Sequence, residues 1–144
     1  MKDLNYQLMK LCKANRDGSF STQATRRRIL DRIANQLHEL GYKHMQAKSL
    51  KPKHVEALVS LWKDQDLSVG TLKNLLSGLR WWARHVGKGD MIPKDNSAYD
   101  IGNRSQVATE SKAWELKEEQ LARVSDEYVR LSLRLQAAFG LRRE

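Results

Sequence analysis

The sequence predicts an all-α protein with a bundle of about four helices, then a linker and one or two further helices. Apolar residues recur at helical spacing in four successive segments within residues 1–90. From Gly87 to Ala113 this pattern stops, Leu is absent, and Gly, Asp, Asn, Ser and Lys dominate. Helical spacing resumes at Trp114. We therefore expect a first domain over 1–90, a linker over 91–113 and a second segment over 114–144.

The first two helices are marked by an apolar stripe each. The first stripe comprises Leu4, Leu8, Leu11 and Cys12. After a break at residues 16–19, Ser21 or Thr22 can cap the second helix. The second stripe comprises Ile29, Ile33, Leu37 and Leu40. Gly41 suits the position just after a helix end, where the backbone often turns left-handed.

The third and fourth helices begin at recognisable residues. Pro52 fits a first helical turn, because its missing N–H costs little there. The third stripe comprises Val55, Leu58, Val59 and Trp62. Ser68 opens the fourth helix. The fourth stripe comprises Leu72, Leu75, Leu76, Leu79, Trp82, Ala83 and Val86, with Trp82 expected in the core.

The segment over residues 128–139 fits two patterns. Alternating apolar residues from Val129 to Leu135 match a strand, whereas a helical stripe joins Tyr128, Leu131, Leu135, Ala138 and Phe139. Leu, Arg, Gln and Ala favour helices, and only Val129 is β-branched, so we expect a helix. Tyr128 is expected in the core.

The net charge of +9 and the pI near 9.8 indicate a polyanionic partner. Residues 114–144 carry six basic and six acidic side chains, so the entire excess lies in residues 1–113. A basic protein without a nucleic-acid role is the alternative. Cys12, the single cysteine, cannot form an internal disulfide. No signal peptide or membrane-spanning run is recognisable, so we expect a reducing cytoplasm.

The fourth helix carries the main candidate nucleic-acid face. No acid occurs from Leu67 to Gly89, and the side opposite the apolar stripe holds Lys73, Asn74, Ser77, Arg80, Trp81, Arg84 and Lys88. Cations neutralise phosphates, and Ser and Asn bond to phosphates or base edges. Trp81 either packs against sugar and base edges or covers the core beside Trp82.

Two other basic groups are candidates for DNA contact. Arg27 and Arg28 belong to the run Arg26-Arg27-Arg28, of which at least one residue is expected to be solvated and idle. Lys51 and Lys53 flank the start of the third helix, where backbone N–H groups favour phosphate. Ordinary surface charge is the alternative for each group. The four histidines lack partners at metal-ligand spacing, so no metal or cofactor is expected.

Two motifs resemble the tyrosine recombinases, the family of phage and conjugative-element integrases. Ser68-x-x-Thr71, followed by Leu72, Leu75-Leu76-Ser77, Leu79-Arg80 and Trp82, resembles the last long helix of their core-binding domain. Gly140-Leu141-Arg142 after an apolar helix resembles the motif that presents their first catalytic arginine. The Asn-Pro that often precedes the catalytic domain in the family is absent, although Ile92-Pro93 and Asp95-Asn96 stand nearby.

The resemblance implies a SAM-like bundle that grips duplex DNA, with Thr71 among the candidate contacts. It implies that Arg142, or Arg143 after a slip of one residue, stabilises charge on the reacting phosphate. The family attacks DNA with a tyrosine, forms a 3′-phosphotyrosyl link and uses no metal or nucleotide cofactor.

The chain is then expected to be the N-terminal part of a recombinase, with residues 114–144 as the truncated N-terminal edge of the catalytic domain. The whole recombinase is expected to form a tetramer on DNA in a bacterial, nucleoid-associated setting. By itself it is expected to be catalytically inactive and monomeric or weakly self-associating. A non-enzymatic basic helical adaptor that binds RNA or a protein is the alternative.

Overall fold

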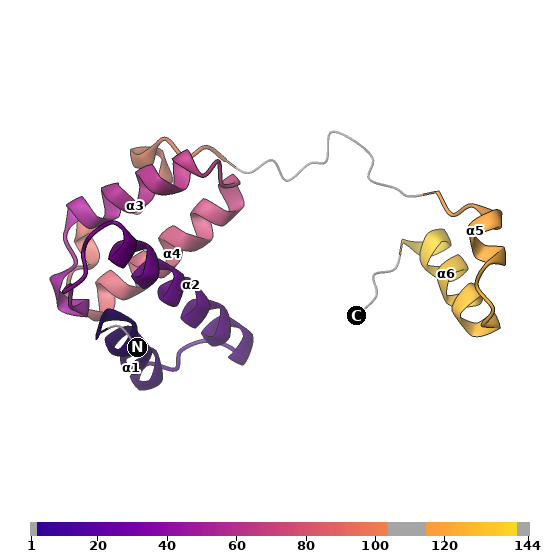
Figure 1. The fold of residues 1–144 in the computed structure, drawn as a ribbon, viewed down its shortest axis with the longest axis horizontal. Helices are drawn as coiled ribbons and strands as arrows, with labels where there is room; N and C mark the ends of the chain where they lie inside the picture. The colour runs from indigo at the N-terminus through magenta and orange to yellow at the C-terminus, as the bar shows by residue number, and fades with distance from the viewer. Residues whose placement is uncertain (1–2, 104–114, 141–144) are drawn as a thin grey trace. The chain divides into compact units, whose positions relative to one another are not determined.

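A computed structural model describes residues 3–103 and 115–140, and it divides the chain into two compact units, 1–104 and 105–144. All regular elements in the described residues are helical, as the sequence predicts (Figure 1). Over residues 3–103, the first unit contains four α-helices and three short 3-10 helices. They are α1 (Asp3–Ala14), α2 (Phe20–Glu39), η1 (Ala47–Ser49), α3 (Pro52–Asp64), α4 (Val69–His85), η2 (Gly89–Met91) and η3 (Asn96–Tyr99).

The helix boundaries follow local chemistry. Ser19, rather than Ser21 or Thr22, caps α2, because its Oγ accepts the Thr22 N–H at 3.2 Å. Gly41 follows α2 with φ of 95°, as predicted for a left-handed helix end. Pro52 occupies the first turn of α3, and Ser68 Oγ caps α4 by accepting the Thr71 N–H.

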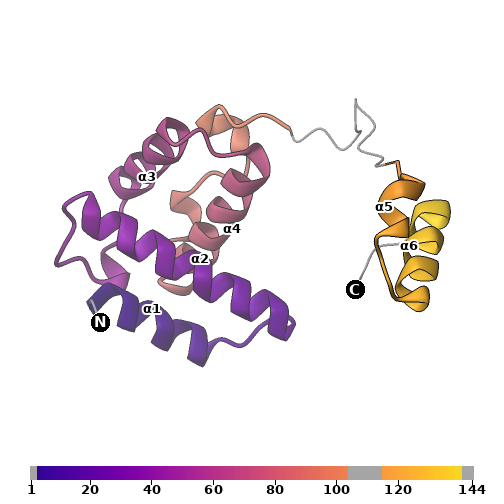
Figure 2. The ribbon, with the colours of Figure 1, turned by 45° about the vertical axis from the view of Figure 1, so that its right-hand side comes forward.

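Helix α2 lies at the centre of the first unit, where it packs against α1, α3 and α4 (Figure 2). The predicted apolar stripes meet there, and both Cys12 and Trp82 are buried as expected. Fully buried side chains include Leu8, Leu30, Ile33, Leu37, Leu50, Leu58, Trp62, Leu76, Leu79 and Trp82. The indole N–H of Trp62 donates to Gln36 at 2.8 Å, and that of Trp82 donates to the Ala47 carbonyl at 2.9 Å. Both buried donors are therefore satisfied.

The first unit extends beyond the predicted boundary at residue 90. Ile92 and Ile101 belong to its core, with 2% and 5% of their surfaces exposed. The prediction that the linker starts at residue 91 is therefore wrong. Ile92 and Ile101 follow short 3-10 helices, where isolated apolar residues become buried without recurring at helical spacing. They therefore cannot be recognised as core residues from the sequence pattern.

The second unit contains α5 (Glu118–Ala122) and α6 (Glu127–Phe139). The prediction of a helix over residues 128–139 is correct, and Asp126 caps it by accepting the Tyr128 and Val129 N–H groups. Leu121 is buried. Tyr128 is 83% exposed, so its predicted core position is wrong: within the described residues only the five-residue α5 lies beside α6, and it is too short to cover the stripe.

Helices α2 and α4 come into close contact at Gly78. A Cβ atom added to Gly78 would overlap the Cγ2 methyl of Ile29. Glycine in the middle of a helix costs about 1 kcal/mol relative to alanine. Here the cost is offset because the missing side chain lets the two helices pack without a gap.

We expect Gly78→Ala to destabilise the protein, although alanine is the better helix former. Overpacking of this kind costs about 1–3 kcal/mol, which exceeds the gain in helix propensity. Urea denaturation of the full chain measures the difference. In an Ile29→Ala background, which removes the clashing methyl, the same Gly78→Ala change should become neutral or stabilising. A more stable Gly78→Ala single variant would show that the helices are not held in this close contact.

Candidate nucleic-acid interface

A groove of about 360 Å³ runs between α2 and α4 on the surface of the first unit. Its floor is formed where Gly78 faces Ile29. The lining residues are Asp17, Ser21, Thr22, Thr25, Arg26, Ile29, Asn74, Ser77, Gly78, Trp81 and Arg84. The groove therefore has an apolar floor and a rim of hydroxyl, amide and guanidinium groups.

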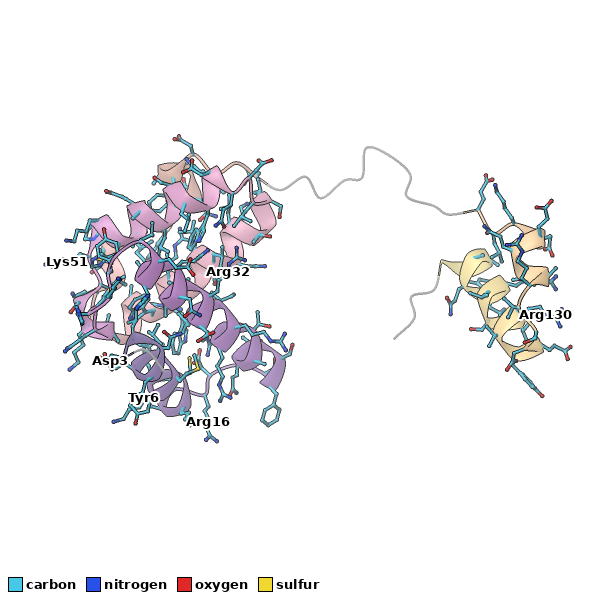
Figure 3. All side chains as sticks on the ribbon, in the orientation of Figure 1. Asp3, Tyr6, Arg16, Arg32, Lys51 and Arg130 are labelled. Atoms are coloured by element: carbon cyan, nitrogen blue, oxygen red, sulfur yellow. The ribbon has the colours of Figure 1, made fainter. Side chains whose placement is uncertain are left out.

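The hydroxyl groups on the α2 wall of the groove were not predicted from the sequence, although Arg28 on the same side of α2 was a candidate for DNA contact. Ser21 and Thr25 are exposed, and neither side chain bonds to another described residue. Helical spacing places Arg28 and Arg32 on the same side of α2, and both are exposed without an ion pair to the described residues (Figure 3 labels Arg32). The recurrence of polar residues at 21, 25, 28 and 32 was the available signal.

The α4 wall keeps only part of the predicted face. Asn74, Ser77 and Arg84 are exposed and line the groove. Arg84 has no ion pair with the described residues. These three side chains can donate hydrogen bonds to an anionic ligand without first breaking an internal contact.

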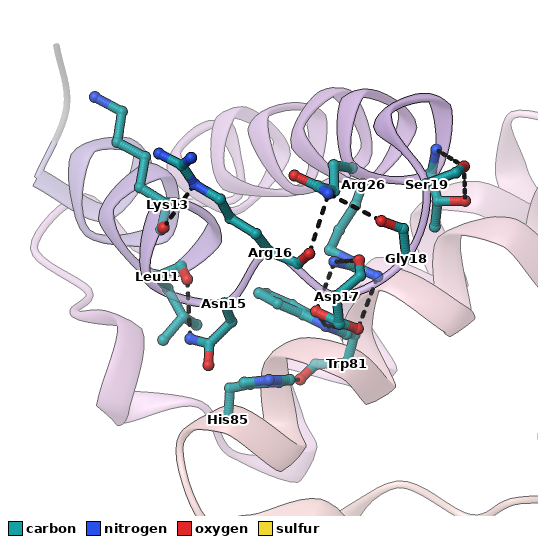
Figure 4. Close-up of polar contacts among 12 residues, drawn as sticks. Leu11, Lys13, Asn15, Arg16, Asp17, Gly18, Ser19, Arg26, Trp81 and His85 are labelled. Carbon is teal, nitrogen blue, oxygen red and sulfur yellow. Dashed lines mark hydrogen bonds and ion pairs between the residues drawn. The ribbon is translucent and has the colours of Figure 1, made fainter.

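Trp81 does not belong to the exposed face, so of its two predicted positions the structure shows the one that covers the core beside Trp82. It is only 3% exposed, and its ring stacks on His85 with 4.1 Å between centroids (Figure 4). The Arg26 guanidinium lies 4.5 Å from the ring centroid. The indole N–H donates to the Asp17 carboxylate at 3.2 Å. The helical projection placed Trp81 opposite the core, but α2 and the loop before it cover that side of α4.

Arg26 and Asp17 complete this cluster. The two side chains form an ion pair at 2.9 Å, with a second bond at 3.1 Å (Figure 4). The Arg26 side chain is 12% exposed, so it is the structural member of the triple-arginine run. The negative charge that Asp17 brings to the groove is balanced by this partner.

Three of the basic side chains predicted to contact DNA, two on α4 and one just after it, form hydrogen bonds within the first unit. The Arg80 guanidinium donates to the Pro93 carbonyl at 2.7 Å and to Asn96 at 2.9 Å. Lys88 Nζ donates to the carbonyls of Lys48 and Leu50 at 2.7 and 2.8 Å. Lys73 Nζ lies 3.5 Å from Asn103 Oδ1. The expectation that these cations form one free face with Arg84 is therefore wrong for Arg80 and Lys88, because backbone carbonyls already bind them.

The other candidates are separated from one another. Arg27 is exposed, but helical spacing places it on the α1 side of α2, near Cys12, and away from Arg28. Thr71 Oγ1 contacts Ser68 Oγ at 2.9 Å in the cap of α4. Lys51 and Lys53 are exposed at the start of α3 and line a different hollow. Arg142 lies outside the described residues.

The described residues contain no cluster of three or more His, Cys, Asp or Glu side chains suited to hold a metal ion. None of the helices that the structure describes is long and apolar enough to cross a membrane.

A comparison with models of protein families shows to which family the chain belongs. The family described as "Phage integrase, N-terminal" matches residues 1–92. The chain belongs to this family. The integrase match spans α1 to α4, so it confirms the resemblance to the N-terminal domain of tyrosine recombinases and the SAM-like helical fold. Comparisons with curated proteins and with solved structures gave no match.

Within this integrase domain, the Asp17 carboxyl has a pKa below its ordinary value. Partial desolvation raises the pKa, but the hydrogen bonds from Trp81 and from its own backbone N–H, with the charges of Arg26 and His85, outweigh that effect. Because the pKa of Asp17 is lower in the folded state, the ionised carboxylate stabilises the fold at pH values above its pKa in the unfolded chain. This stabilisation is lost as the pH falls through the pKa that Asp17 has in the folded state.

We expect Trp81→Phe to raise the pKa of Asp17 toward its ordinary value, because the substitution removes the indole N–H and keeps an aromatic ring. Carboxyl ¹³C shifts followed during an acid titration measure this change. Asp95 is the internal control, since Ser97 Oγ and not Trp81 donates to its carboxylate at 2.6 Å. An unchanged Asp17 titration in the variant would show that the indole does not hold the carboxylate.

Proposed function

We propose that the first unit binds duplex DNA along the α2–α4 groove. The main support for this proposal is the set of exposed polar side chains on the rim of the groove, which comprises Ser21, Thr25, Asn74, Ser77 and Arg84. Arg84 forms no ion pair with the described residues. Hydroxyl and amide groups bond to phosphates and base edges, and guanidinium groups pair with phosphates. Arg28 and Arg32 extend the positive charge along the same side of α2.

The charge distribution supports this surface. Among the described residues, Asp17 is the only acid that lines the groove, and Arg26 is paired with it. A DNA phosphate at Arg84 or Arg28 would therefore meet uncompensated positive charge. Thr71, Lys73, Arg80 and Lys88 are engaged in the fold, so in this proposal they support the surface and are not its principal contacts.

We further propose that the chain acts in DNA integration and recombination as part of a site-specific tyrosine recombinase. Membership of the integrase family favours this role over that of a basic adaptor for RNA or protein. Arg142 is then the arginine that stabilises charge on the reacting phosphate, and duplex DNA is the partner. A tetramer on DNA and a bacterial, nucleoid-associated location follow from the same proposal.

Duplex binding should depend strongly on salt. If about six phosphates are neutralised, the logarithm of the association constant should fall against the logarithm of salt concentration with a slope of about −5, since each phosphate contributes about −0.9. Fluorescence anisotropy of a labelled duplex at several salt concentrations measures the slope. A flat dependence, or no binding at low salt, would contradict a DNA-binding role.

Arg28→Ala and Arg84→Ala should each weaken duplex binding and reduce the magnitude of the salt slope by about 1, as expected for a lost phosphate contact. Their unfolding free energies should change little, because neither side chain has an ion pair within the part of the chain that the structure describes. Arg27→Ala is the matched control, since it removes the same charge from the other side of α2. Equal losses for Arg27→Ala and Arg28→Ala would show that net charge, and not the groove, determines binding.

A further inference from the structure

A second hollow lies at the start of α3 and shares no lining residue with the α2–α4 groove. The segment after α2 and the first turn of α3 form its walls. The lining residues are Gly41, Tyr42, Lys43, His44, Met45, Ser49, Lys51, Lys53 and His54. Figure 3 labels Lys51 at this edge of the first unit.

Three lysines surround this hollow without a counter-charge. Lys43, Lys51 and Lys53 are all exposed, and none forms an ion pair with the described residues. None of the described residues that line the hollow is acidic. Lys53 Nζ lies over the Tyr42 ring, 5.8 Å from the ring centroid. The hollow therefore concentrates positive charge that nothing in the described fold neutralises.

His54 supplies a fixed donor at the same place. The residue is 5% exposed, and its ring packs edge-on against Tyr42 with 4.5 Å between centroids. Its Nδ1 accepts the Lys51 N–H at 3.1 Å, so in the neutral ring the proton is on Nε2. This Nε2 has no hydrogen-bond partner among the described residues, and the atom is accessible from the surface although His54 as a whole residue is only 5% exposed.

The neutral form of His54 is favoured by its surroundings. Burial lowers its pKa, and the charges of Lys53, Lys51 and Lys88 lower it further. The imidazole therefore keeps one acceptor, used by Lys51, and one donor at Nε2.

The backbone adds a second donor. The Lys51 carbonyl accepts the His54 N–H at 3.0 Å, whereas Pro52 has no N–H and the Lys53 N–H has no partner among the described residues. Helix α3 has 13 residues, and its first turn directs the positive end of the helix dipole toward this point.

We infer that this hollow is a phosphate-binding site, in which His54 Nε2–H and the Lys53 N–H donate to phosphate oxygens and Lys43, Lys51 and Lys53 neutralise the charge. A phosphate group fits because it offers several acceptor oxygens to donors that converge from a side chain, a helix start and flexible cations. The inference stands on this hollow alone and does not require that the α2–α4 groove binds DNA.

Titration of the full chain with sodium phosphate, at constant ionic strength set with sodium chloride, tests the site. Protein NMR should show saturable shifts of the His54 ring and the Lys53 amide. The double variant Lys51→Gln/Lys53→Gln should lose these shifts, while the indole signals of Trp62 and Trp82 report that the fold is intact. Lys10→Gln, on the exposed side of α1, removes a charge elsewhere and should leave the shifts unchanged.

Small shifts spread over all lysines, or equal shifts in the double variant, would overturn the inference. A short DNA duplex added to the same sample identifies the source of the phosphate. If the duplex displaces inorganic phosphate from His54, the bound group is a backbone phosphate of DNA; if it does not, the site takes a free phosphate anion. Arg28→Ala and Arg84→Ala should leave phosphate binding intact, so failure of the groove proposal remains distinguishable from failure of this one.

Discussion

The close contact between α2 and α4 at Gly78 is the constraint on which the candidate interface depends. Because Gly78 has no side chain, the Ile29 methyl packs directly against the α4 backbone. The polar side chains on either side of this contact then become the two walls of one groove. A side chain at position 78 would separate the helices, and the hydroxyl groups of α2 would no longer lie beside Ser77 and Asn74.

Positive charge in the first unit serves two different purposes. Arg26, Arg80 and Lys88 hold the fold, because they bind a carboxylate or backbone carbonyls of other segments. Arg28 and Arg84 make no such contacts with the residues that the structure describes, so we propose that they are available to a ligand. Net charge therefore overstates the binding surface. The internal partners, and not the number of cations, decide which side chains can release counterions from DNA.

The second unit presents an amphipathic helix whose apolar side is largely uncovered within the described residues. The exposed side chains of α6 include Tyr128, Val129, Leu131, Leu135 and Phe139. Its single described ion pair, Arg134 to Glu118 at 3.2 Å, joins exposed side chains and contributes little stability. Its packing therefore differs in kind from that of the first unit, where the stripes of four helices meet around α2.

The sequence by itself determined the main helices, the Ser68 cap of α4 and most residues of the main core, because apolar periodicity and capping chemistry act within a few neighbouring residues. It also indicated the family, through the motif around α4. Tertiary structure decided which polar side chains remain free. A helical projection assigned Trp81 and Arg80 to an open face, but α2 covers one and residues 93–96 bind the other. Ser21 and Thr25 became part of a site only through the approach of α4, a contact between residues about 50 positions apart that local patterns cannot encode.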